Sequence, residues 1–395
     1  MNILFLLKSL YVGGIEVVTT VLANKFVEEG HNVTIWCFLK SSTSLENKVN
    51  DRIHIYYGNG FQISPNNIHN LRNILIQNNI DIVINQKGLP FIPIITLKFA
   101  SIGLKTKIIS VYHSDPSANG RILNPDLRKP NRKTFIINNY QKIKYRATKY
   151  ITSMSMEFVY HCSNKYILLS NNYINKFRDF TKLKHTQKIS IIANPVTKYN
   201  NDFSFENAPK EKNIIFVGRI DNNKRIDRII ESWNLLYGKY PEWRLLFVGD
   251  GPQKEEAMRL GKKLNIKSEH IHFEGFTSPI PYYEKASILM LTSDFEGFPL
   301  VLTECMSFGV IPIVYGSFDA VYDIIDDNKD GYIIPYSKEK GFVAKDMADK
   351  LEFLMTNGDK RTEMALAAIE KSKKFSIDKI YNEWINVFNS LQVHR

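Results

Sequence analysis

Short apolar runs alternate with stretches of helical periodicity along the first 115 residues, and this alternation restricts the fold more than any other feature of the chain. The runs rich in Ile, Val and Leu have strand length and lie at 2–7, 32–38, 81–85 and 107–112. Between the first two runs, Ile15, Val18, Leu22 and Phe26 recur at helical spacing up to Gly30. Strands that alternate with helices form parallel sheets covered on both faces. We therefore predict one doubly wound α/β domain.

A second series of the same kind begins after the turn 194–196 and the polar segment 198–212. Its predicted strands are 213–217, 243–248, 270–273, 287–291 and 310–314, and its predicted helices are 225–237, 255–264, 300–308 and 343–356. The sequence thus predicts two Rossmann-like domains, 1–195 and 196–375. The last segment, 376–395, carries apolar residues on one helical face, with Ser376 placed as N-cap, and another element must cover that face.

Length and composition exclude several classes of protein. At 395 residues, with 44% hydrophobic and 23% charged residues, the chain is a folded protein of two domains and not a disordered one. Cys37, Cys162 and Cys305 are scattered, which argues against a disulfide framework or a zinc site and favours a reducing cytoplasm. The N-terminus lacks a basic leader region, and no apolar stretch approaches membrane-spanning length, so we expect neither a signal peptide nor a membrane span.

Positive charge is concentrated in the first half of the chain. Residues 1–190 contain 25 Lys or Arg against 10 Asp or Glu, and the excess peaks between Arg121 and Lys149, where nine basic residues face only Asp126. Two interpretations stay open: a solvated lysine-rich surface, or a patch that meets an anionic membrane or an anionic glycan acceptor. Tyrosines interleave with these residues, but no nucleic-acid-binding motif accompanies them, so nucleic acid is not an expected partner.

Motifs for several common chemistries are missing from the sequence. The first turn, Tyr11 to Glu16, lacks the second and third elements of the G-x-G-x-x-G fingerprint, so NAD is not expected. We find no Walker A, H-E-x-x-H or G-x-S-x-G pattern. No D-x-D pair is present that could hold a divalent cation between nucleotide phosphates. We therefore expect neither a metal nor another cofactor.

The most informative stretch is 292–304, TSDFEGFPLVLTE, which follows a predicted buried strand and opens a helix. Gly297 and Pro299 fit a helix start, where free backbone N–H groups favour an anion such as a diphosphate. Glu296 lies before that helix, and Glu304 lies about a turn and a half inside it. On spacing alone, two surface glutamates remain the alternative.

At this point the motifs resemble those of retaining glycosyltransferases of family 4. The resemblance is carried by the E-x7-E spacing of Glu296 and Glu304, by V-G-R…K over 217–224, and by F-V-G-D-G-P over 247–252. The weaker G-G-x-E at 13–16 and N-P-V at 194–196 extend it over most of the chain. The chain is most similar to the bacterial members that build lipopolysaccharide core, capsule or teichoic-type glycans.

The resemblance implies a GT-B architecture, in which two Rossmann-like domains face a central cleft. Residues 1–195 would bind the acceptor, and 196–375 would bind the nucleotide sugar. The helix at 376–395 would pack back on the first domain, and the segments near 190–205 and 375 would act as hinges. Domain closure would then exclude water from the donor.

The resemblance also implies roles for individual residues of the second domain. Arg219 and Lys224 would stabilise the departing nucleoside diphosphate without a metal. Glu296 would be catalytic or would position the donor sugar, and Glu304 would bond the ribose hydroxyls. Further donor contacts would come from Gly218, Gly297, Phe298, Pro299 and Leu300. Arg225 stands where relatives often have Gly, and either contacts a phosphate or solvates the helix start.

Three weaker assignments come with alternatives. Gly13 and Gly14 would contact the distal phosphate and sugar of the donor, or would only form a tight turn. His113 would touch the sugar, although a lone histidine is more often structural. Phe276 would hold the nucleobase, or would be an ordinary core aromatic.

The sequence therefore predicts a retaining, metal-independent glycosyltransferase that moves a sugar, most simply from a UDP donor, to a glycan or lipid-linked acceptor in bacterial surface polysaccharide synthesis. Such an enzyme would be cytoplasmic, with the option of a peripheral contact at the inner membrane face. One alternative is a catalytically weak, nucleotide-sugar-binding scaffold subunit, which the complete set of Arg219, Lys224, Glu296 and Glu304 disfavours. Another is an epimerase or phosphorylase of the same architecture.

Overall fold

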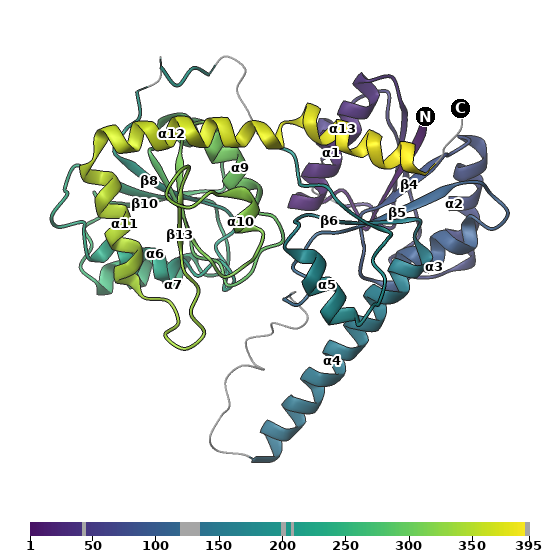
Figure 1. Ribbon diagram of the computed structural model, residues 1–395, viewed down its shortest axis with the longest axis horizontal. Coiled ribbons are helices and arrows are strands. Elements are labelled where there is room, and N and C mark those ends of the chain that lie inside the picture. The colour runs from purple at the N-terminus through teal and green to yellow at the C-terminus, as the bar shows by residue number, and fades with distance from the viewer. Residues whose placement is uncertain (42–44, 119–134, 199–202, 207–208, 392–395) are drawn as a thin grey trace. The chain divides into compact units, whose positions relative to one another are not determined.

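The computed structural model describes residues 1–41, 45–118, 135–198, 203–206 and 209–391. Tertiary contacts divide the chain into two units, one of Met1–Asn194 with Ile377–Arg395 and one of Pro195–Ser376. Each unit is built around its own parallel sheet, as Figure 1 shows.

The first unit holds a sheet of seven strands in the order β3-β2-β1-β4-β5-β6-β7, and every pairing is parallel. The strands are β1 (Asn2–Leu7), β2 (Asn32–Cys37), β3 (His54–Tyr57), β4 (Ile82–Asn85), β5 (Lys107–Tyr112), β6 (Lys165–Leu168) and β7 (Ile189–Ile191). The helices are α1 (Gly14–Glu28), α2 (Pro65–Gln77), α3 (Phe91–Ala100), α4 (Phe135–Cys162), α5 (Tyr173–Thr181) and α13 (Ile377–Ser390), with a short 3-10 turn at Glu46–Lys48. A doubly wound domain was predicted without a strand order, and the strands β3, β6 and β7 were missed, because each is only three or four residues long.

The last helix, α13, packs against α1 in this unit. Phe388 and Tyr381 each lie with their ring centroids 5.5 Å from that of Phe26 on α1. Lys25 forms an ion pair with Asp378 at 2.5 Å. The buried face of α13 consists of Ile380, Trp384, Val387 and Phe388. The amphipathic face seen in the sequence is therefore covered by the first helix of the chain, 350 residues away.

The second unit holds a sheet of six strands in the order β10-β9-β8-β11-β12-β13, again all parallel. The strands are β8 (Asn213–Val217), β9 (Arg244–Val248), β10 (Ile271–Gly275), β11 (Ile288–Leu291), β12 (Ile311–Tyr315) and β13 (Tyr332–Ile334). The helices are α6 (Ile226–Asn234), α7 (Lys254–Lys263), α8 (Ile280–Lys285), α9 (Leu300–Ser307), α10 (Val321–Ile324), α11 (Ala344–Thr356) and α12 (Gly358–Ser372), followed by a 3-10 turn at Lys373–Phe375. The central strands of both sheets are buried on their two faces, which explains their continuous apolar sequences.

Some predicted bounds were wrong. The helix predicted at 225–237 is α6, which ends at Asn234. It begins one residue later than predicted, because Arg225 adopts a left-handed conformation with φ of 49° that cannot belong to the helix. The strand predicted at 270–273 extends to Gly275 as β10. The longest helix, α4, was missed, because the sequence from 116 to 152 matched no motif.

Candidate functional site

The predicted donor residues gather where the strand order of the second sheet reverses. Strand β8 lies between β9 and β11, and ligands of such sheets bind at the carboxyl ends of the strands around this point. Gly218 directly follows β8, and the segment from Thr292 to Pro299 directly follows β11. Two motifs more than 70 residues apart in the sequence therefore meet at one edge.

Hydrogen bonds fasten these two loops to each other. The backbone N–H of Asp294 donates to the carbonyl of Asn223 at 2.8 Å, and the Asn223 amide donates to the carbonyl of Phe295 at 3.0 Å. The Thr292 hydroxyl donates to the carbonyl of Arg225 at 2.8 Å. Asn223 lies within the V-G-R…K motif, but sequence reasoning gave it no role.

Lys224 and Glu296 form an ion pair at this junction. The Lys224 Nζ lies 2.6 Å from Oε1 of Glu296, and both side chains are largely buried. An ammonium group has three N–H donors, so this contact leaves Lys224 able to bind a phosphate oxygen as well. Arg219, at the same strand end, is 69% exposed, and its nearest carboxylate is Asp221 at 3.9 Å. The structure thus joins Lys224 to Glu296 and leaves Arg219 accessible.

The helix α9 starts beside this ion pair. Pro299 occupies its N-cap position and Leu300 is its first residue. Phe298 is buried and packs its ring 5.5 Å from that of Phe375. The ring of Phe298 therefore belongs to the core, and any donor contact of Gly297 and Phe298 would use their backbone.

Glu304 on α9 is only 2% exposed, which makes the alternative of a surface glutamate wrong. One carboxylate oxygen accepts a hydrogen bond from the Thr197 hydroxyl, and the other accepts one from the Tyr283 hydroxyl at 3.1 Å. Lys198 Nζ lies 4.0 Å from the second oxygen. Each carboxylate oxygen can accept a further bond. Thr197 and Tyr283 were missed, because nothing in a one-dimensional pattern places them beside α9.

The F-V-G-D-G-P motif packs closely against the backbone of Gly218. A Cβ atom at Gly249 would lie 1.9 Å from the carbonyl oxygen of Gly218, so no other residue fits there. The N–H of Gly249 donates to the carbonyl of Gly275 at 2.8 Å. Phe276 follows and is 82% exposed, so the alternative that it is a core aromatic is wrong.

Arg225, for which the sequence suggested a phosphate contact or solvation of the helix start, pairs with two carboxylates. Its guanidinium donates three hydrogen bonds to Asp227, at 2.7, 3.0 and 3.3 Å, and lies 3.7 Å from Asp294. Its positive φ explains why glycine would suit this position. Asp294 is held in addition by Arg228 at 2.8 Å. The guanidinium of Arg225 therefore stabilises the loop that carries Glu296 through its contact with Asp294.

The first unit has a corresponding edge, where β1 lies between β2 and β4. Gly13 is the N-cap residue of α1, and Gly14 is its first residue. A Cβ atom at Gly13 would lie 2.7 Å from Oε2 of Glu16, so glycine leaves room for this carboxylate. Glu16 is buried and lies 3.7 Å from Lys87, another residue that sequence reasoning missed. Burial lowers the pKa of Lys87.

His113 follows β5 at the same edge. Its Nε2 lies 2.6 Å from Oε1 of Gln86, which is itself buried. Burial, reinforced by the charge of Lys87, lowers the pKa of His113 to about 3. The imidazole is therefore neutral at physiological pH, with Nε2–H donating to the amide oxygen of Gln86.

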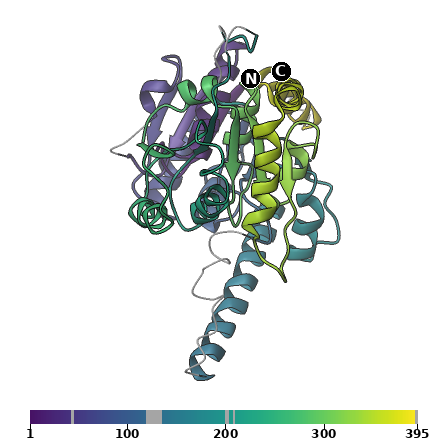
Figure 2. The same cartoon turned by 90° about the vertical axis from the view of Figure 1, so that its left-hand side faces the viewer.

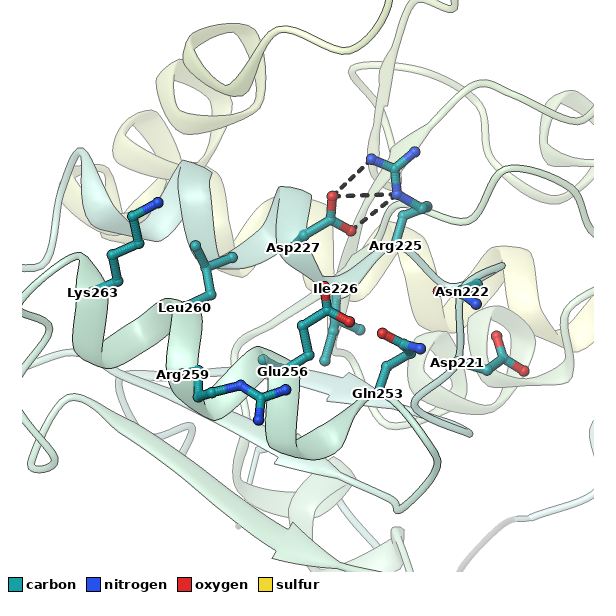
Figure 3. A pocket seen from close by; sticks show the side chains of 11 residues that line it. Asp221, Asn222, Arg225, Ile226, Asp227, Gln253, Glu256, Arg259, Leu260 and Lys263 are labelled. Atoms are coloured by element: carbon teal, nitrogen blue, oxygen red, sulfur yellow. Dashed lines mark hydrogen bonds and ion pairs between the residues drawn. The ribbon is translucent and has the colours of Figure 1, made fainter. Parts of the chain in front are cut away.

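A pocket of about 380 Å³ lies between α6 and α7 in the second unit (Figure 3). Acidic and basic side chains alternate around it, among them Asp227, Glu256, Arg259 and Lys263. Among its described lining residues, Arg225 is the one that the sequence linked to a phosphate, and three acidic side chains balance three basic ones. It offers no clear preference for an anion or a cation.

Two features are absent from the described part of the chain. No group of three or more His, Cys, Asp or Glu is arranged there to hold a metal ion. No helix there is both long and apolar enough to cross a bilayer.

Comparison with known families decides the class of the protein. Residues 12–198 match the family model described as Glycosyltransferase Family 4, and residues 198–371 match the one described as Glycosyl transferases group 1. The chain belongs to glycosyltransferase family 4. The two matches meet at residue 198, close to the boundary between the two structural units.

Relatives and solved structures agree with membership of family 4. The chain is 27% identical over 98% of its length, and 98% of the relative's, to a GalNAc-alpha-(1->4)-GalNAc-alpha-(1->3)-diNAcBac-PP-undecaprenol alpha-1,4-N-acetyl-D-galactosaminyltransferase of Campylobacter jejuni. It is 31% identical to an uncharacterized glycosyltransferase of Haemophilus influenzae, over 50% of this chain and 54% of that protein. The solved structure of Anabaena HepE in complex with UDP superimposes with a TM-score of 0.71 at 14% identity, covering 99% of this chain and 100% of HepE. The fold is therefore GT-B, as the sequence predicted.

Proposed function

We propose that this family 4 glycosyltransferase is a retaining, metal-independent enzyme that transfers a hexosyl or N-acetylhexosaminyl group from a UDP-sugar to a glycan or lipid-linked acceptor of a bacterial surface polysaccharide. The observation that carries the proposal is the ion pair of Lys224 with Glu296 at the reversal point of the second sheet. In this proposal, the diphosphate and the sugar of the donor meet at this cation and this carboxylate. HepE was solved with UDP, which supports the choice of nucleotide.

In the proposed reaction, the bond between the anomeric carbon and the diphosphate oxygen breaks, and its electron pair leaves with UDP. Lys224, Arg219 and the N–H groups at the start of α9 stabilise the charge that grows on the diphosphate. The acceptor oxygen bonds to the same face of the anomeric carbon, and its proton passes to the departing phosphate oxygen. Glu296, oriented by Lys224, positions the donor sugar, and Glu304 binds the ribose hydroxyls. Phe276 offers an exposed face to the nucleobase.

The name of the Campylobacter relative specifies an acceptor linked through a diphosphate to undecaprenol. This supports a lipid-linked acceptor for the present chain. A peripheral contact of the basic cluster 121–149 with an anionic membrane belongs to the same proposal. Residues Arg121, Arg128, Lys129, Arg132 and Lys133 lie outside the described residues, whereas Lys142 to Lys149 lie on α4.

The test is a transfer assay in the presence of EDTA, with a panel of UDP-sugars and polyprenyl-diphosphate-linked or soluble glycan acceptors. We expect one UDP-sugar to give a product, and NMR of that product to show the anomeric configuration of the donor. An inverted product would contradict retention, and loss of activity in EDTA would contradict metal independence. Binding of UDP-sugars without any transfer or hydrolysis would favour the scaffold alternative.

A further inference from the structure

The short helix α8 ends against a lysine that comes from another part of the second unit. A helix leaves its last four carbonyl groups without partners of its own. The N–H of Ser287, which would continue α8, donates instead to the carbonyl of Asn213 at 3.0 Å. The Nζ of Lys210 donates to the carbonyls of Tyr283 and Glu284, at 2.7 and 2.9 Å. Lys210 therefore caps α8 at the end where the helix dipole favours a cation.

Aromatic rings connect the same lysine to α9. The Nζ of Lys210 lies 5.1 Å from the ring centroid of Phe203. The ring of Phe203 lies 5.1 Å from that of Phe308, the residue at the C-terminal end of α9. The ring of Phe308 lies in turn 5.7 Å from that of Tyr283. Lys210 thus contacts α8 directly and α9 through two rings.

Tyr283 links this packing to the proposed donor site. Its side chain is fully buried, and its hydroxyl donates to Oε2 of Glu304 at 3.1 Å. Burial, reinforced by the charge of Glu304, raises the pKa of Tyr283 well above its ordinary range, so the hydroxyl keeps the proton that it donates. One residue therefore carries both a carbonyl that Lys210 binds and the hydroxyl that holds Glu304.

The charge of Lys210 has no carboxylate partner. Among the described residues, it donates hydrogen bonds to carbonyl groups alone. Burial lowers its pKa to about 7, and the other titratable groups around it are Glu284, Cys305 and Arg361. Arg361 lines the same cavity of about 240 Å³ from α12, the helix along the top of the second unit in Figures 1 and 2. A buried charge without a counter-ion is costly, so the contacts of Lys210 with α8 indicate what the residue does.

We propose that Lys210 is a positioning residue of the proposed donor site, which fixes α8 so that Tyr283 holds the Glu304 carboxylate in the orientation that binds the ribose. Lys210 touches no donor atom and acts through Tyr283. It lies three residues before β8, at the amino end of the second sheet, whereas the site lies at the carboxyl end. The inference rests on the proposed function, because it takes from there the role of Glu304 in ribose binding.

The test is calorimetric titration of UDP into the wild type, Lys210→Met, Tyr283→Phe and the double variant. Tyr283→Phe should weaken UDP binding by about tenfold, because Glu304 loses a hydrogen bond. Lys210→Met should weaken it by about fivefold, which is typical of a residue that modulates binding without touching the ligand. The double variant should bind UDP like Tyr283→Phe alone, because Lys210 acts only through Tyr283. A loss equal to the product of the two single losses would overturn the proposal.

A pH series tests the same link without any change at Lys210. A protonated amine donates stronger hydrogen bonds than a neutral one, and it also interacts with the helix dipole. The dissociation constant of UDP should therefore differ more between Tyr283→Phe and the wild type at pH 6 than at pH 8, on the two sides of the pKa of Lys210. Titration of UDP itself affects both proteins and cancels in the ratio. A ratio that does not change with pH would contradict the proposal.

Two further variants complete the design. Lys285→Met is the matched control, because Lys285 lies on α8, is 65% exposed and pairs with Glu211. It should bind UDP like the wild type, and a loss equal to that of Lys210→Met would overturn the inference. Glu304→Gln separates the inference from the proposed function. If Glu304→Gln binds UDP as tightly as the wild type, both fail; if it binds weakly while Lys210→Met binds normally, only the inference fails.

Discussion

The hydroxyl of Thr197 donates a hydrogen bond to Oε1 of Glu304, so the third residue of the second unit holds the carboxylate proposed to bind the ribose. Beside it, the N–H of Val196 donates to the carbonyl of Phe375 at 2.8 Å. Phe375, one residue before the end of this unit, packs on Phe298 at the start of α9. The segments by which the chain enters and leaves the second unit are therefore both bonded to the proposed donor site.

Thr197→Val should weaken UDP binding by about tenfold, because removal of a hydrogen bond to a charged group costs about 1.5 to 3 kcal/mol and part of this is recovered by solvent. The valine has nearly the same shape, so the melting temperature should change little. Isothermal titration calorimetry with UDP measures the effect. Thr197→Ser keeps the hydroxyl and should restore most of the affinity; equal affinities for all three proteins would show that Thr197 does not position Glu304.

Glu304→Gln should reduce the affinity for UDP more than it reduces turnover at saturating donor. An amide keeps the volume but loses the charge and one acceptor, so ribose binding weakens while the reacting bond is untouched. Steady-state kinetics with varied donor gives KM and kcat separately. A fall in kcat with KM unchanged would place Glu304 in the chemical step instead.

Arg219→Ala should lower kcat by about 100- to 1000-fold, by analogy with the loss of one preorganised group that stabilises developing charge. Arg219 is mostly exposed and its nearest carboxylate, that of Asp221, is 3.9 Å away, so folding should be unaffected. Arg259→Ala, at the pocket of Figure 3, is a matched control outside the proposed site. A loss below tenfold for Arg219→Ala, or an equal loss for the control, would remove the role of Arg219 in catalysis.

Lys224→Met and Glu296→Gln should each destabilise the protein by about 1 to 3 kcal/mol, because each leaves one charge of a largely buried pair without its partner. The double variant should lose less than the sum of the two. Chemical denaturation of the four proteins measures this coupling. If the two losses of unfolding free energy simply added, the ion pair would make no contribution to stability.

The neutral state of His113 gives a pH dependence. Its pKa is about 3 in the folded protein and about 6.5 in the unfolded chain, so the unfolded chain binds the extra proton as the pH falls below 6.5. His113 therefore contributes stability above pH 6.5, and this is lost progressively between pH 6.5 and 3, by up to a few kcal/mol. His113→Gln should flatten the stability profile in that window. NMR titration of the imidazole that shows protonation near pH 6.5 in the native protein would contradict the assignment.

The sheets and the motif residues could be predicted from the sequence because both depend on local patterns. Apolar runs of five or six residues, such as β1 and β8, mark strands by themselves, and the order of a doubly wound sheet follows from their alternation with helices. What could not be predicted depends on contacts between distant residues. Tyr283 and Thr197 reach Glu304 only in the folded chain, because they lie 21 and 107 residues from it in the sequence. The pairing of Arg225 with Asp227 and Asp294 could not be predicted either. Arg225 adopts a left-handed backbone conformation that is rare for arginine.

The most direct test of the central claim is a thermal-shift panel of UDP, GDP, CMP, NAD and several UDP- and GDP-sugars, each with and without EDTA. A ligand present at 100 times its dissociation constant adds about 2.7 kcal/mol to the stability of the state that binds it. The account predicts that UDP and one UDP-sugar raise the melting temperature equally in both conditions, and that Glu304→Gln reduces this rise. Stabilisation by NAD alone, by no nucleotide, or by UDP only without EDTA would contradict a metal-independent UDP-sugar site.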